Sequence, residues 1–166
     1  LRVAAFNVEN YFNGDGRGAG FDDPDNRGAR TPAEFARQEA KILSALQGLN
    51  ADVIGLMEIE NNGYGELSAI HRLTGKLGPD WRFIDPGVEK LGRDSIKVAL
   101  VYNARAVEPA GKPATLELGQ RTRQPLAATF RLPGHPRKIT VVVNHFKSKR
   151  CNDARGANAD QRDGQS

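Results

Sequence analysis

The order of the apolar runs along the chain is the feature that most constrains its fold. Runs at 1–8 and 51–60 are short, apolar and bounded by polar residues, which is typical of buried strands. A helical pattern follows each of them, at 31–48 and 64–77. Further strand-like runs lie at 81–84, 96–102, 126–132 and 139–146, with a weak strand near 116–118. This order predicts mixed α/β layers in place of a purely parallel, doubly wound sheet.

The first helix has clear start and stop signals in the sequence. Thr31 can cap it, Pro32 suits the first helical position, and Glu34 stands three residues after the cap. Apolar residues follow at helical spacing, namely Phe35, Ile42, Leu43, Leu46 and Leu49. Gly48 is a plausible stop, so we expect a helix that begins after Thr31 and ends near Gly48.

Length and composition exclude several classes of protein. At 166 residues the chain suggests one domain, and no run approaches the roughly 20 apolar residues needed to cross a bilayer. Cys151 is the single cysteine, which excludes a disulfide within the chain and any cysteine-rich zinc site. Residues 13–30 are rich in Gly and Asp and form a long predicted loop, and loops of this length are usually functional or disordered.

The formal net charge of +4 is unevenly distributed. Acidic side chains outnumber basic ones in residues 1–83, whereas basic side chains predominate in residues 84–166. A basic second half indicates either an anionic partner or an ordinary solvated surface, and charge alone does not separate the two.

Three polar residues lie at the C-terminal ends of apolar strands, where ligand crevices form in α/β sheets: Asn7, Glu58 and His145. A carboxylate there can bind a hard divalent cation, a histidine can transfer protons, and an amide can bind a phosphate oxygen. The structural alternatives are a loop hydrogen bond for Asn7, an ion pair for Glu58 and a purely structural histidine. Three such residues at equivalent strand ends favour a shared site.

Basic residues flank these strands, a pattern typical of phosphate-backbone binding. Lys147, Lys149 and Arg150 follow His145, and Arg121 and Arg123 precede the strand at 126–132. The alternative is a charged sheet edge that discourages aggregation.

At these residues the chain resembles the endonuclease/exonuclease/phosphatase superfamily. The matching segments occur in family order: the opening strand with Asn7, the glutamate strand with Glu58, the run from Asp94 to Asn103, Arg123-Gln124-Pro125-Leu126, and the run from Asn144 to Lys149. The chain is most similar to secreted bacterial extracellular nucleases, which share its Phe-Asn-Val-Glu-Asn-Tyr-Phe opening. The resemblance implies a four-layer α/β/β/α sandwich of two mixed sheets, as in pancreatic deoxyribonuclease, incomplete at the C-terminus.

The resemblance also implies residue roles. Glu58 would coordinate Mg²⁺ (alternatively Mn²⁺ or Ca²⁺), and Asn7 would help to hold the scissile phosphate and the metal shell. His145 would transfer protons or contact the phosphate, so Asn7 and His145 are the candidate catalytic residues. Arg123, Asp94 and Lys147 would approach the substrate phosphates.

Two family motifs are absent from the chain, a Gly-Asp-x-Asn strand end and a final Ser-Asp-His segment. We therefore expect residues 1–166 to be the N-terminal portion of one domain and to be inactive alone. By the same resemblance, Cys151 would pair with a cysteine just beyond Ser166.

The predicted function is metal-dependent phosphodiester hydrolysis by an endonuclease that acts on DNA, or also on RNA, outside the bacterial cell or in the periplasm. The alternatives are a phosphatase or phospholipid phosphodiesterase of the same fold, or a non-catalytic binding domain. Fold alone does not decide among them.

Overall fold

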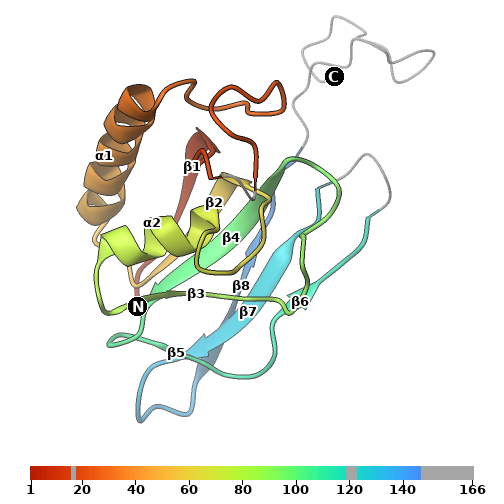
Figure 1. Ribbon diagram of the computed structural model, residues 1–166. Coiled ribbons are helices and arrows are strands. Elements are labelled where there is room, and N and C mark those ends of the chain that lie inside the picture. Colours follow the sequence, from red (N-terminus) through yellow and green to blue (C-terminus); the bar gives the residue numbers. More distant parts are fainter. Residues whose placement is uncertain (16–17, 119–122, 147–166) are drawn as a thin grey trace, which may run out of the picture.

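The computed structural model of the protein describes residues 1–15, 18–118 and 123–146, and it consists of two packed sheets with helices on one side (Figure 1). The predictions for Lys147, Lys149, Arg150, Arg121 and Cys151 lie outside the described residues. The first sheet has the order β1-β2-β4-β3, with β1 and β2 parallel and the other pairs antiparallel. Its strands are β1 (Val3–Tyr11), β2 (Val53–Glu60), β3 (Trp81–Phe83) and β4 (Ile96–Asn103).

The second sheet is antiparallel throughout its described strands. These strands are β5 (Glu108–Pro109), β6 (Ala114–Thr115), β7 (Leu126–Arg131) and β8 (Lys138–Val143). The short strands β5 and β6 pair with opposite ends of β7, and β8 pairs with β7 along its whole length. Within the part of the chain that the structure describes, the other edge of β8 has no partner strand.

Both helices pack on the outer face of the first sheet (Figure 1). Helix α1 spans Pro32–Gly48, as predicted. The Thr31 side chain caps it by accepting a hydrogen bond from the Glu34 backbone N–H. Helix α2 (Ala69–Leu77) begins later than the predicted residue 64, because Ser68 is its N-cap. Leu67, whose apolar side chain suggested an earlier start, is 48% exposed.

Two hydrophobic cores separate the layers. The first lies between the helices and the first sheet and contains Tyr11, Leu46, Leu56 and Leu73. The second fills the space between the two sheets. It consists mainly of residues from β2, β4, β7 and β8, including Val53, Leu100, Leu126, Phe130 and Val143. The alternation of β7 follows from this packing, because its buried residues face the first sheet and the intervening ones do not.

Some element boundaries differ from their prediction. The prediction of a weak strand near 116–118 is wrong, because Leu116 and Leu118 are exposed and lie outside the short strands β5 and β6. Strand β1 continues to Tyr11, three residues beyond its predicted end, and β8 ends at Val143. No helix in the described ranges combines the length and the apolar character that a bilayer crossing requires.

Candidate active site

A double irregularity in the first sheet positions Asn7 and Glu58. The β1–β2 register shifts between Asn7 and Tyr11, and the β2–β4 register shifts between Leu56 and Ile59. Glu58 has a φ of +69°, a conformation that L-residues rarely adopt. Asn7 and Glu58 therefore lie near the C-terminal ends of their strands, as predicted, at a bulge that the sequence did not indicate. Bulges of this kind re-aim side chains and are frequent next to active sites.

The bulge brings the Glu58 carboxylate to the Asn7 amide. The Asn7 Nδ2 donates to Glu58 Oε1 at 2.9 Å, and the Asn10 backbone N–H donates to Glu58 Oε2 at 3.0 Å. The Asn7 Oδ1 accepts from the Glu9 backbone N–H at 2.9 Å, so this amide is oriented from both of its ends. Glu9 and Asn10 also have positive φ, 54° each, which turns this part of β1 toward Glu58.

His145 reaches the same place from the second sheet. It lies two residues after β8, and its Nε2 is 3.5 Å from Glu58 Oε1, longer than an ordinary hydrogen bond. Its Nδ1 is buried and has no hydrogen-bond partner among the described residues. Burial and the positive charge of Arg123 lower the pKa of His145, with the Glu58 and Asp94 carboxylates opposing them. The lowered pKa favours the neutral imidazole, in which one ring nitrogen can accept a proton.

Arg123 and Asp94 form an ion pair beside His145. The Arg123 Nε donates to Asp94 Oδ2 at 3.0 Å, and its Nη1 donates to the carbonyl oxygen of Phe146 at 3.3 Å. A second guanidinium, that of Arg27, donates to Asp94 Oδ1 at 2.8 Å. Burial alone would raise the pKa of Asp94, but the two guanidinium groups hold this pKa below its usual range.

The structure thus brings together five of the six predicted site residues; the sixth, Lys147, lies outside the described residues. Sequence reasoning missed Arg27. Its only signal was its place in the loop 13–30, whose length suggested a function.

The donor set at Glu58 fits a magnesium ion. Mg²⁺ prefers oxygen ligands, keeps several of its waters, and is usually bound by one or two carboxylates together with substrate phosphates. The Glu58 carboxylate is a donor of this kind. The Asn7 amide turns its nitrogen to Glu58 and its oxygen to the Glu9 backbone N–H, so it orients the carboxylate. The described ranges contain no group of three or more His, Cys, Asp or Glu side chains placed to hold a metal ion. The geometry therefore suits a one-carboxylate site and does not suit a site enclosed by protein ligands.

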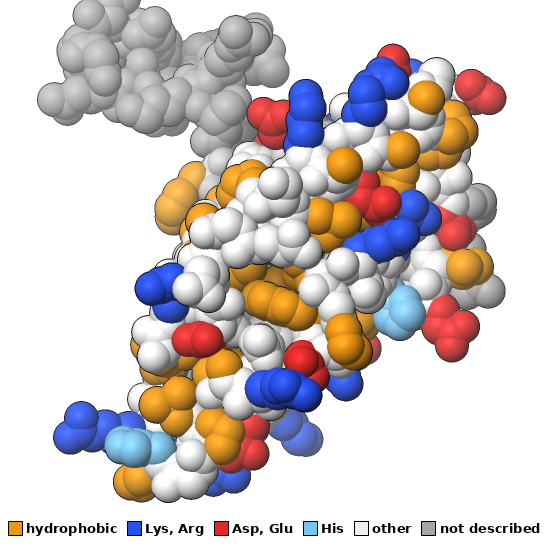
Figure 2. Space-filling model, turned by 90° about the vertical axis from the view of Figure 1, so that its left-hand side faces the viewer, with side chains coloured by type: hydrophobic (Ala, Val, Ile, Leu, Met, Phe, Trp, Pro, Cys, Tyr) orange, Lys and Arg blue, Asp and Glu red, His pale blue; other side chains and the backbone are white. Residues whose placement is uncertain are grey.

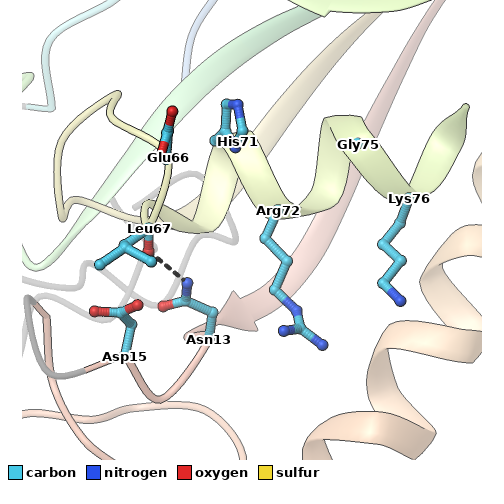
Figure 3. A pocket seen from close by; sticks show the side chains of 8 residues that line it. All are labelled: Asn13, Asp15, Glu66, Leu67, His71, Arg72, Gly75 and Lys76. Atoms are coloured by element: carbon cyan, nitrogen blue, oxygen red, sulfur yellow. Dashed lines mark hydrogen bonds between the residues drawn. The ribbon is translucent and has the colours of Figure 1, made fainter. Parts of the chain in front are cut away.

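The molecule also has a pocket on its helix side (Figure 3). It has a volume of about 490 Å³ and lies between the segment after β1 and helix α2, where Gly75 leaves open space. Asn13, Asp15, His71 and Lys76 are among its lining residues, and Glu58 and His145 are not. The candidate site is therefore separate from this pocket.

On the side of the molecule where α1 lies, basic, acidic and apolar side chains are intermixed (Figure 2).

Comparison with known proteins supports the fold. No protein-family model matches the chain, and no curated protein matches its sequence. The structure is similar to that of a humanized D. rerio TDP2, with 15% identity and a TM-score of 0.59 over 90% of this chain and 49% of that one. It is also similar to the human Nocturnin catalytic domain with bound sulfate anion, with 15% identity and a TM-score of 0.56 over 89% and 50%.

The chain spans about half the length of these two solved chains. Their similarity confirms the predicted fold, an α/β sandwich of two packed sheets, and membership of the endonuclease/exonuclease/phosphatase superfamily stays a prediction. Membership of the bacterial secreted branch stays a prediction.

Proposed function

We propose that this protein is a divalent-metal-dependent phosphodiesterase that hydrolyses nucleic acid, with DNA as the first substrate to test. One observation carries the proposal: Glu58, Asn7 and His145, from three different strands or strand ends, meet within hydrogen-bond or ion-pair distance at one edge of the sandwich. A carboxylate, an amide and a histidine beside an arginine are among the groups that metal-assisted hydrolysis of a phosphodiester can use.

Each residue has a distinct part in this chemistry. Glu58 would hold the Mg²⁺, which when bound neutralises charge on the phosphoryl oxygens, and Asn7 would orient the Glu58 carboxylate. Neutral His145 can take up a proton at a ring nitrogen as a water oxygen attacks phosphorus, or hold the phosphate in position. Arg123 offers a fixed cation to the phosphate oxygens beside His145.

A polyanionic substrate agrees with the charge of the chain. Basic residues predominate in the half that contains Arg123 and His145, which favours a nucleic acid over a single phosphorylated headgroup. The similar Nocturnin domain was solved with a bound sulfate anion, a tetrahedral anion like phosphate. A phosphatase, a phospholipid phosphodiesterase and a non-catalytic domain are the competing outcomes of the test.

The test compares plasmid DNA, an inositol phosphate and a phospholipid as substrates of the complete gene product, with Mg²⁺ or with EDTA. We expect DNA cleavage that needs Mg²⁺ and that Glu58→Gln reduces at least about 100-fold. Glu108→Gln is the matched control, because Glu108 pairs with Arg131 on the second sheet, away from the site. Metal-independent cleavage, or equal loss in both variants, would contradict the proposal.

A second measurement addresses the chain itself. Because the Gly-Asp-x-Asn and Ser-Asp-His motifs are absent from residues 1–166, we expect these residues alone to show no turnover. Metal-dependent turnover by purified 1–166 would show that the residues in hand suffice.

A further inference from the structure

The Asp94 carboxylate holds two guanidinium groups that come from distant parts of the chain. Arg27 lies in the loop before α1, Arg123 lies three residues before β7, and their contacts with Asp94 measure 2.8 and 3.0 Å. Exposed ion pairs contribute little to stability, and Arg27 is half exposed. The stability of the fold is therefore a weak explanation for this arrangement.

Two neighbours fix Arg27 in place. Asn26 is fully buried, its Nδ2 donates to the Gly20 carbonyl, and its Oδ1 accepts from the Gly28 backbone N–H at 2.8 Å. A Cβ at residue 28 would overlap the Asn10 carbonyl oxygen, so only glycine allows the loop to pack this closely against β1. The residues on both sides of Arg27, Asn26 and Gly28, are therefore held by buried or close contacts. These contacts fix the backbone position of Arg27.

That position is next to the candidate active site. The loop packs at Gly28 against Asn10, whose backbone N–H binds Glu58. On the other side, Arg123 binds the carbonyl of Phe146, the residue that follows His145. The cluster of Arg27, Asp94 and Arg123 therefore connects the loop packed on the Glu58 bulge with the segment that contains His145.

The charges and donors of the cluster suit a phosphate. Two arginines and one aspartate leave an excess of one positive charge. Each guanidinium has five N–H donors in a planar fork, and the contacts described occupy only some of them. Arginine forks of this kind recognise phosphate oxygens in pairs.

We propose that Arg27 and Arg123, held together on Asp94, form a phosphate clamp for the nucleic-acid strand next to the scissile phosphodiester. The proposal rests on the proposed function and adds Arg27, which no motif indicates, as a substrate-binding residue. Asp94 then acts as a positioning residue through the arginines, in place of the direct phosphate contact that the resemblance implied, because a carboxylate repels a phosphate.

The test is the salt dependence of duplex DNA binding by the complete gene product in EDTA, measured by fluorescence anisotropy. Each phosphate contact contributes about 0.9 to the slope of log K against log salt, so Arg27→Ala lowers the slope by about 0.9. Arg105→Ala is the matched control. Arg105 also pairs with an aspartate, Asp80, but it follows the other end of β4, roughly 25 Å from Asp94 by strand length. We expect the control to keep the parental slope.

Asp94→Asn separates positioning from simple charge. This variant makes the protein more positive, so a purely electrostatic role predicts tighter DNA binding. The clamp predicts weaker binding, because both guanidinium groups lose their anchor. Arg27→Lys keeps the charge without the fork, and we expect it to recover only part of the affinity. Urea denaturation of each variant identifies any loss that comes from unfolding.

The outcomes distinguish this proposal from the proposed function. An unchanged slope in Arg27→Ala, an equal loss in Arg105→Ala, tighter binding by Asp94→Asn, or no salt-dependent DNA binding by the parent chain each overturns the clamp. None of these bears on metal-dependent cleavage, which is measured with Glu58→Gln. Conversely, absence of metal-dependent cleavage by the complete protein would contradict the proposed function and leave the salt slopes of Arg27→Ala and Arg105→Ala to decide the clamp.

Discussion

Two carboxylates on opposite sides of the first sheet show how differently the fold treats charged groups. Glu39, on α1, is 7% exposed and receives Arg72 through both oxygens, at 2.6 and 3.0 Å, and the Tyr11 hydroxyl at 2.6 Å. Glu58 receives an amide and a backbone N–H, and its histidine neighbour is 3.5 Å away. The Glu39 carboxylate is therefore bound by side chains of its own fold through both oxygens. The Glu58 carboxylate is 3.5 Å from His145, which is longer than a hydrogen bond.

The difference separates a group that stabilises from a group that can bind a ligand. Burial raises the pKa of Glu39, and Arg72 and Tyr11 more than offset it, so the pKa is lowered. Arg72 also lies over the Phe35 ring, 5.0 Å from its centroid, which links the ion pair to the apolar core. Near Glu58, the buried Nδ1 of His145 has no hydrogen-bond partner among the described residues, which leaves it able to bond a ligand.

The largest effect on stability is expected on the helix side. Arg72→Met leaves the buried Glu39 carboxylate without its cation and should reduce the free energy of unfolding by about 2–3 kcal/mol. Urea denaturation measures this loss. Arg105→Met, which breaks an exposed ion pair, is the control and should cost less than about 1 kcal/mol. Similar losses in both variants would remove the contrast between a closed network and a surface pair.

A pH-dependent effect on stability is expected at Lys97, which is buried on the helix side beneath the Tyr64 ring. Burial lowers the pKa of Lys97 from 10.5 to about 7, so between these values the unfolded chain binds more protons than the folded one. The free energy of unfolding should therefore rise with pH in this window, by up to about 1.4 kcal/mol per unit. Lys97→Met should flatten this rise in urea titrations at several pH values. An unchanged slope would show that Lys97 is not its source.

Removing a single hydroxyl tests the closed network more gently. Tyr11→Phe deletes one hydrogen bond to Glu39 while Arg72 remains, and should cost about 1 kcal/mol in thermal or urea unfolding. The control is Tyr102→Phe, which removes the hydroxyl of a half-buried tyrosine in β4. A larger loss in the free energy of unfolding for Tyr102→Phe than for Tyr11→Phe would contradict this prediction.

The smallest effect on stability is expected at the site itself. Glu58→Gln keeps the size of the side chain but loses one of the two hydrogen bonds that the carboxylate accepts, so the free energy of unfolding should fall by no more than about 1 kcal/mol. Its effect on metal-dependent cleavage is expected to be large, which is the reverse of the expectation for Arg72→Met. A destabilisation comparable to that of Arg72→Met would place Glu58 among the structural carboxylates.

Much of the fold follows from local sequence. Thr31, Pro32 and Gly48 mark the first helix because capping chemistry depends on neighbouring residues, and the apolar runs at β2 and β4 mark buried strands. The start of α2 was missed because the cap at Ser68 competes with an apolar residue, Leu67, that has the right spacing and is exposed.

The candidate site was only partly predictable. Asn7, Glu58 and His145 were found because polar residues after apolar runs are unusual, and a family resemblance added Arg123 and Asp94. Arg27 could not be found in this way, since its role depends on a contact with a residue 67 positions away. The bulge at Glu58 has no local signal either, because no glycine or proline marks its positive φ.

That positive φ has a consequence for how the protein can change over generations. A glutamate in this conformation costs about 1 kcal/mol or more, which glycine would not pay. One base change converts a glutamate codon into a glycine codon, so a route to a more relaxed backbone is always within mutational reach at residue 58. Glycine would relieve this strain but would remove both hydrogen bonds of the Glu58 carboxylate. We expect relatives that have the proposed activity to carry glutamate at this position, and exchange to glycine to accompany its loss.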